Sequence, residues 1–245
     1  MYSYAVEMKE LHCTLSNSSV ACNCMSSQAV RVLALLTGKP RPFREDGTMS
    51  AIARQPATGP VMLGELGFEG DQVADPVHHG GPDMAIHHYP FDHYAYWQQK
   101  LDSHKLLQKP GAFGENISTR GLVESEMRIG DRFRLGQALV ELTKGRQPCW
   151  KLDHRFGVSG KQSVMAEIVR TARCGFYYRV LEPGLVQAGD VMRLVEPGPS
   201  AWTVDRVFRL LVGGQYKAEP EAVRKLADLP QLAADWRKRA AALAD

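Results

Sequence analysis

The chain has 245 residues, which predicts one large domain or one domain with a small satellite. Apolar residues make up 44% and charged residues 23%, enough for a real core, while a net charge of +3 with scattered basic residues argues against a nucleic acid polymer as partner. No apolar run approaches the roughly 18 residues of a membrane span, no signal peptide is visible, and five cysteines make a poor disulfide framework. A cytoplasmic protein is expected.

Residues 1–28 differ from the rest of the chain. They are rich in Ser and Asn, hold three of the five cysteines and show no sustained helical or strand period. We expect a disordered or non-native extension, with Met25 as a hypothetical natural start. Cys22 and Cys24 form a lone C-x-C pair, which is a weak metal signal without a second pair.

From residue 29 the pattern is typical of short strands. Val30 to Leu36 predicts a buried strand, and further strands are expected between Gly, Pro and Asp residues, at 60–66, 84–89, 132–135, 138–143, 175–181 and 190–195. Two helices are expected, at 91–101 and 161–171. The result is a mainly β (α+β) fold, a barrel or folded-over sheet with peripheral helices, over residues 29–198. No nucleotide-binding motif is present.

The C-terminal segment, residues 199–245, predicts a small domain of three helices. Thr203 can cap a helix whose apolar positions run from Val204 to Leu211 at helical spacing. Two more are expected near Pro220 and after Pro230. Such short helices need a packing partner, so we expect them to pack on each other and against the main domain or a partner subunit.

Cys149 is the leading candidate for chemistry. It follows the strand at 138–143, and Lys144, Arg146 and Lys151 are close in sequence. Nearby positive charge favours a thiolate, the form that binds metals and acts as a nucleophile. The alternative is a buried structural cysteine.

The segment 78–90 is the second concentration of polar residues. Gly80 and Gly81 allow close approach of the main chain to a ligand, and His79 beside them is the preferred polar contact. The four histidines of the segment lack a zinc-type partner motif, so a zinc site is disfavoured. In the third segment, Glu115 and Asn116 follow Gly114. Ligand recognition and a simple turn are equally good interpretations of these residues.

Together these segments resemble the MOSC domain, named after the C-terminal domain of molybdenum cofactor sulfurase, and within it the bacterial 6-N-hydroxylaminopurine resistance proteins. The resemblance covers about residues 29–196, and the tail resembles the three-helix domain of this subgroup. The matching stretches are LTGKPRPF (36–43), SAIAR (50–54), LGELGFEGDQ (63–72), HGGPDMAIHHYP (79–90), HYAYW (93–97), FGENIS (113–118), IGDRFRLG (129–136) and GRQPC (145–149).

The resemblance implies a molybdenum-pterin cofactor with Cys149 as the metal ligand, which suits a soft thiolate. It makes Lys39, Arg54 and Arg146 candidates for contacts to the pterin phosphate. Glu115 and Asn116 would face the pterin or the substrate, and the turn at 80–81 would form a pocket wall. The sequence departs from the family pattern at two places. Met84 stands where a basic residue is common in the subgroup. The segment before Cys149 also differs from the usual pattern, so Arg146 is a more secure candidate for an anion contact than Lys144.

The expected function is reduction of N-hydroxylated bases or related N-oxygenated compounds by a molybdoenzyme. No Fe–S, flavin or nicotinamide motif is present, so electrons would come from a separate flavoprotein or small carrier. Two alternatives remain. One is a carrier that delivers molybdenum cofactor without turnover, and the other is sulfur transfer through a persulfide on Cys149. The oligomeric state stays open.

Overall fold

The structure, a computed structural model, describes residues 29–244. The expectations for residues 1–28, including the start at Met25 and the pair Cys22 and Cys24, lie outside the described residues.

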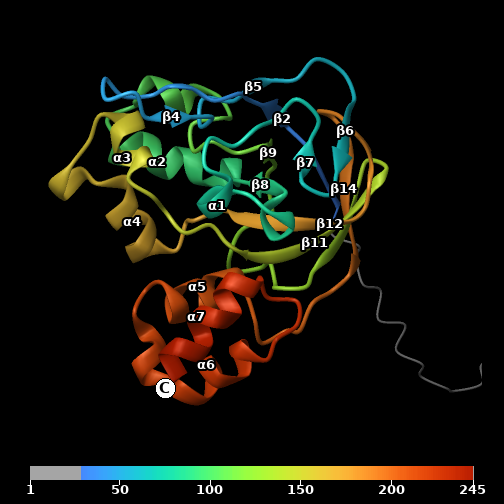
Figure 1. The fold of residues 1–245 in the computed structure, drawn as a ribbon, viewed down its shortest axis with the longest axis vertical. Coiled ribbons are helices and arrows are strands. Elements are labelled where there is room, and N and C mark those ends of the chain that lie inside the picture. The colour runs from blue at the N-terminus through green and yellow to red at the C-terminus, as the bar shows by residue number, and fades with distance from the viewer. Residues whose placement is uncertain (1–28, 245) are drawn as a thin grey trace, which may run out of the picture.

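A curled mixed sheet forms the frame of the larger part of the protein (Figure 1). In the described residues it has nine strands in the order β1-β14-β10-β11-β12-β8-β9-β2-β5. Paired strands are antiparallel except β8 and β9. Smaller sheets, β13-β6-β7 and β3-β4, complete it. The strands are β1 Ala29–Arg31, β2 Ala34–Thr37, β3 Arg41–Pro42, β4 Met49–Ser50, β5 Gln55–Pro56, β6 Val61–Gly64, β7 Gly67–Phe68, β8 Ile86–His88, β9 Ile117–Ser118, β10 Arg132–Leu135, β11 Ala138–Gly145, β12 Phe176–Glu182, β13 Gly184–Val186 and β14 Val191–Glu196.

The strand expected from Val30 to Leu36 is divided in two, which is a correction to the sequence pattern. β1 pairs with β14 near one end of the sheet, whereas β2 pairs with β9 and β5 at the other end. Between them Val32 donates its N–H to Asp190 and Leu33 donates to Ser118. The chain therefore crosses between the two ends of the sheet here, and this crossing curls the sheet toward a barrel.

In the described part of the chain, four α-helices accompany the sheet and three follow it (Figure 1). The expected helices correspond to α2 and α4, each preceded by a short 3-10 turn, and α4 begins where the Ser163 side chain accepts the N–H of Ala166. No helix was expected directly after Cys149, where α3 lies. The helices are α1 Pro76–His79, α2 Tyr94–Lys100, α3 Lys151–Phe156, α4 Val164–Thr171, α5 Val204–Leu211, α6 Pro220–Ala227 and α7 Ala234–Ala244.

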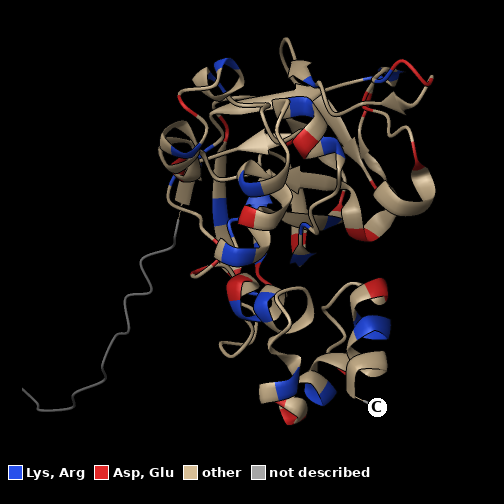
Figure 2. Ribbon diagram, turned by 90° about the vertical axis from the view of Figure 1, so that its left-hand side faces the viewer, with Lys and Arg blue, Asp and Glu red and all other residues tan. Residues whose placement is uncertain are grey.

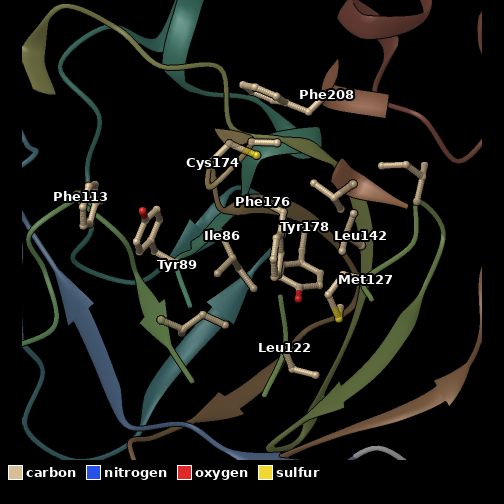
Figure 3. Close-up of a cluster of buried hydrophobic side chains, with 14 of the residues drawn as sticks. Ile86, Tyr89, Phe113, Leu122, Met127, Leu142, Cys174, Phe176, Tyr178 and Phe208 are labelled. Atoms are coloured by element: carbon tan, nitrogen blue, oxygen red, sulfur yellow. The ribbon is translucent and has the colours of Figure 1, made fainter. Parts of the chain in front are cut away.

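The hydrophobic core fills the inside of the curled sheet, where side chains from distant strands point toward one another (Figure 3). Ile86, Phe176 and Tyr178 are fully buried there. The strands alternate between this interior and the outside, as in β10, where Phe133 and Leu135 are buried and Arg132 and Arg134 are not.

The C-terminal helices form a small helical domain against β11, as expected. Thr203 caps α5 by accepting the N–H of Arg206. Gly145, at the end of β11, leaves no room for a side chain, because an added Cβ would lie 3.3 Å from atoms of both Phe208 and Trp236. The helices are thus packed on the strand that leads to Cys149. Within residues 29–244 no helix is long and apolar enough to cross a membrane.

Candidate functional site

A cavity of about 380 Å³ lies beside the end of β11. Its walls come mainly from residues 50–54, 71–87 and 113–116, with Arg146, Lys151 and, from β12, Tyr177. These are the segments singled out in the sequence, and the volume falls in the range of small-molecule sites. The fold therefore brings together the glycine turn, the FGENIS segment and the approach to Cys149.

The turn at 80–81 forms one wall of the cavity. Gly81 has a φ of 99°, a conformation that side chains rarely adopt. A Cβ on Gly80 would lie 2.9 Å from the carbonyl oxygen of Pro76. Both positions require glycine, so the close approach of the backbone to the cavity is built into the sequence.

Arg54 and Asn116 line the cavity, but their polar groups form hydrogen bonds to other residues of the wall. These bonds shape the cavity. Arg54 donates to both carboxylate oxygens of Asp71, at 2.9 and 2.8 Å, and to the carbonyl of Gly114 at 2.5 Å. Asn116 donates to Asp71 at 2.9 Å and accepts the N–H of His87 at 3.1 Å. The charge of Arg54 is therefore neutralised within the wall.

Three other residues of the lining carry a buried nitrogen without a hydrogen-bond partner in the described structure. These are Nη1 of Arg146, Nδ1 of His79 and Nε2 of His87. The His79 nitrogen is 3.8 Å from the Asp75 carboxylate, too far for a hydrogen bond. Leaving buried polar groups unpaired is costly, so three of them around one cavity indicate a site for a polar ligand.

The electrostatics of the cavity favour an anion. Figure 2 shows basic and acidic residues interspersed along the ribbon, so positive charge is concentrated only locally. Burial lowers the pKa of His79, and the positive charges of Lys151 and Arg146 lower it further. Burial also holds the pKa of His87 well below its usual range, with Arg146 adding to the effect. An anion would offset these positive charges.

Cys149 is half-buried and is not itself one of the residues that line the cavity. It lies on the loop between Arg146 and Lys151, which both contribute to the lining. The pKa of Tyr177 is raised, mainly by burial, and negative charge on Cys149 contributes, so the sulfur is close to this wall. The sulfur is therefore not sealed in apolar packing, unlike that of Cys174, which is fully buried.

Two sequence-predicted residues do not face the cavity. Glu115 is fully buried behind the wall, where its carboxylate accepts the hydroxyl of Tyr94 at 2.5 Å and the backbone N–H of Gly111 at 2.6 Å. It supports the loop instead of contacting a ligand. Lys39 is exposed and lies outside the lining. Lys144, the less secure cation of its segment, is instead paired with Asp235 of α7 at 2.5 Å.

Sequence reasoning missed His87, Lys151 and Tyr177 as lining residues. His87 had a usable signal. It lies in β8 and makes its contacts on the opposite side from His88, which bonds Thr119 in the interior at 2.9 Å. Lys151 was seen only as a nearby cation, and nothing in the local sequence marks Tyr177.

Comparison with known proteins gives consistent matches. The model of the MOSC domain matches residues 75–193, and the model of the YiiM-like, 3-alpha helix domain matches residues 202–243. YflK of Bacillus subtilis is 39% identical over 191 residues, 76% of this chain and 82% of its own. YiiM of Escherichia coli is 43% identical over 65% of this chain and 69% of its own.

A third relative is more distant. A protein of Gibberella moniliformis named reductase is 34% identical over 75% of this chain, which spans only 31% of that longer protein. Among solved structures, YiiM of Geobacillus stearothermophilus has a TM-score of 0.72 at 28% identity, covering 88% of this chain and all of its own. YiiM of Escherichia coli has a TM-score of 0.71 at 30% identity, covering 88% and 92%.

Proposed function

The chain belongs to the MOSC domain family, and on that premise we propose that it is a molybdenum-cofactor-dependent reductase of N-hydroxylated bases or related N-oxygenated compounds. The observation that carries the proposal is the set of unpartnered nitrogens on Arg146, His79 and His87 in a cavity whose lining residues Arg146 and Lys151 flank Cys149 in the sequence. The relative named reductase agrees with this class of reaction.

The residues fit an anionic, sulfur-rich cofactor. Arg146 would donate to its oxyanions, because a guanidinium offers several N–H donors in a plane and stays charged. Lys151 adds a second cation, and the Gly80–Gly81 turn lets the backbone pack closely on a flat ring. Cys149 would be the metal ligand, since soft thiolates bind sulfur-ligated metals well.

When bound, the cofactor would supply the two-electron reduction of the substrate. The N–O bond breaks, the nitrogen gains one proton, and the hydroxyl oxygen gains another and leaves as water. His79 lies at the cavity with its Nδ1 near Asp75 and can hold a proton there once an anion offsets the charges of Lys151 and Arg146. The two electrons would come from a separate reductase, a flavoprotein or small electron carrier.

The direct test is turnover. The chain would be expressed with molybdate, its molybdenum and pterin measured, and 6-N-hydroxylaminopurine supplied with an artificial reductant, with adenine as the expected product. Cys149→Ser should lose most of the metal and the activity. Cys174→Ala is the matched control, because Cys174 is buried away from the cavity lining. Full metal content in Cys149→Ser would remove the ligand assignment.

The same preparation separates the alternatives. Tight molybdopterin binding without adenine formation would favour a cofactor carrier. A stable persulfide on Cys149, detected by mass spectrometry after treatment with a sulfide donor, would favour sulfur transfer. Arg146→Met should lower the molybdenum content at least tenfold, because a charge-assisted bond is worth about 1.5–3 kcal/mol. Lys39→Met, exposed and outside the lining, should leave it unchanged.

A further inference from the structure

Trp150, directly after Cys149, is unusual among the tryptophans of this chain. It is 42% exposed, whereas Trp97, Trp202 and Trp236 are at most 8% exposed. A large aromatic side chain is normally covered, because its burial contributes strongly to stability. An exposed indole next to the candidate metal ligand therefore needs another explanation.

The indole is held in place by aromatic and cationic neighbours. The ring of Phe43, from the β3–β4 hairpin, is 6.0 Å from it, and that of His154, from α3, is 6.2 Å away. Phe43 and His154 also contact each other edge to face at 4.7 Å, and His154 bonds the Phe43 carbonyl at 3.0 Å. The guanidinium of Arg44 lies 5.2 Å from the centre of the Trp150 ring. The ring is fixed in orientation, yet remains partly open.

A second hollow adjoins this cluster. It is open to solvent, and Phe43, Arg44 and His154 line it together with Asp46. Arg44 and Asp46 form a half-exposed ion pair at 3.4 Å on its rim. The other arm of the same hairpin contributes residues 50–52 to the cavity beside Cys149. One hairpin thus borders both hollows, and Trp150 lies next in sequence to the candidate metal ligand.

We propose that Trp150, with Phe43 and His154, forms a stacking platform for a planar nitrogen heterocycle at the second hollow, on the loop that carries Cys149. The flat face of a purine-type base would pack on the indole, and Arg44 and Asp46 would supply a donor and an acceptor for the ring edge. A base stacked there would lie on the side chain of the residue that directly follows the candidate metal ligand Cys149. The inference rests on the proposed function for the reaction, but the binding step does not need the metal.

Binding is tested first, on the full chain without cofactor, with 6-N-hydroxylaminopurine as the probe. Trp150 is the most exposed indole, so the base should quench the exposed part of the tryptophan emission saturably. In Trp150→Phe this quenching should disappear, while calorimetry shows a dissociation constant within about 3-fold of wild type, since the ring is kept. Trp150→Ala should weaken binding roughly 5- to 150-fold, which matches about 1–3 kcal/mol for a stacked base.

Kinetics of the molybdenum-loaded enzyme give the second readout. Trp150→Ala should raise KM for 6-N-hydroxylaminopurine by a similar factor, with kcat changed less than about 2-fold, and leave KM for hydroxylamine, which has the N–O bond and no ring, unchanged. The ratio of the two KM values is independent of the amount of folded enzyme. Val195→Ala, which trims an exposed apolar residue on β14, is the control.

The outcomes distinguish the two proposals. Equal quenching in wild type and Trp150→Phe, no quenching at all, or an equal rise of KM for both substrates would overturn the platform. Binding that depends on Trp150 without any turnover would leave the platform standing and refute the reductase.

Discussion

Asp83 joins the cavity wall to the C-terminal helices, and its replacement by alanine should destabilise the protein by about 1–3 kcal/mol. Its carboxylate accepts the N–H of Ala234, the first residue of α7, at 2.9 Å and pairs with Arg179 at 2.8 Å. Its backbone carbonyl accepts the hydroxyl of Thr143 in β11 at 2.7 Å. The carboxylate is two residues after Gly81, so it links the turn of the cavity to the helical domain.

The magnitude follows from the two contacts that alanine removes. An acceptor for a free N–H at a helix start is worth about 0.5–2 kcal/mol. A partly exposed ion pair adds about 0.2–1 kcal/mol. Arg179 keeps Glu141 as a partner at 3.2 Å, so no buried charge is left unpaired and no larger loss is expected. In a chain of this size the sum corresponds to a decrease in Tm of roughly 2–12 °C.

Thermal unfolding followed by circular dichroism on the cofactor-free protein measures this change. Asp83→Asn keeps an oxygen that can accept the Ala234 N–H and should recover at least half of the loss. Glu221→Ala, which removes an exposed ion pair with Arg224 on α6, is the control and should cost under about 1 kcal/mol. If Asp83→Ala lowers Tm no more than Glu221→Ala, the connection between the turn and α7 contributes nothing, and the reasoning fails.

Two further perturbations address the cavity itself. Gly114→Ala should destabilise the protein by about 1–3 kcal/mol more than Gly59→Ala, as measured by chemical denaturation. Both glycines have positive φ (73° and 77°), but only at position 114 would the added Cβ lie 2.6 Å from Ile52. Equal losses of stability in the two variants would contradict this. Binding of inorganic phosphate to the cofactor-free chain should be strongest at low pH, because the anion offsets Arg146 and raises the pKa of His79 from its lowered free value. The gain in phosphate affinity is complete below the pKa that His79 has in the free protein, and it is lost as pH rises through the higher pKa that His79 has in the phosphate complex. Calorimetry should show proton uptake on binding. A pH profile that persists in His79→Ala would exclude this residue as its source.

Much of the fold was predictable from local patterns. The alternation in β10 and the cap at Thr203 gave the correct elements, because each is determined by residues a few positions apart. The break between β1 and β2 was not predictable, since it depends on partners at Ser118 and Asp190, far along the chain. α3 was missed because six residues are too few to show a helical period.

The candidate site was predictable as a set of segments and less so as a set of side chains. Glu115 and Asn116 are neighbours just before β9, but the Glu115 carboxylate binds Tyr94 and Gly111 on the inside, whereas Asn116 lines the cavity. One therefore faces the cavity and the other supports the loop from inside, and the sequence does not say which. The alternation along β8 shows that His87 and His88 point to opposite sides, but which of them faces the cavity depends on how β8 pairs with β12.

Two arginines of the cavity show that the partners a side chain finds in the fold decide whether it can bind a ligand. Arg54 and Arg146 were both candidates for anion contacts, with Lys39, and both line the cavity. Arg54 is neutralised by Asp71 in a two-point contact, so it fixes the wall and adds little field inside. Arg146 keeps Nη1 unpartnered and lowers the pKa of both His79 and His87. The positive charge that would hold an anionic cofactor therefore comes from Lys151 and Arg146, which flank Cys149 in the sequence.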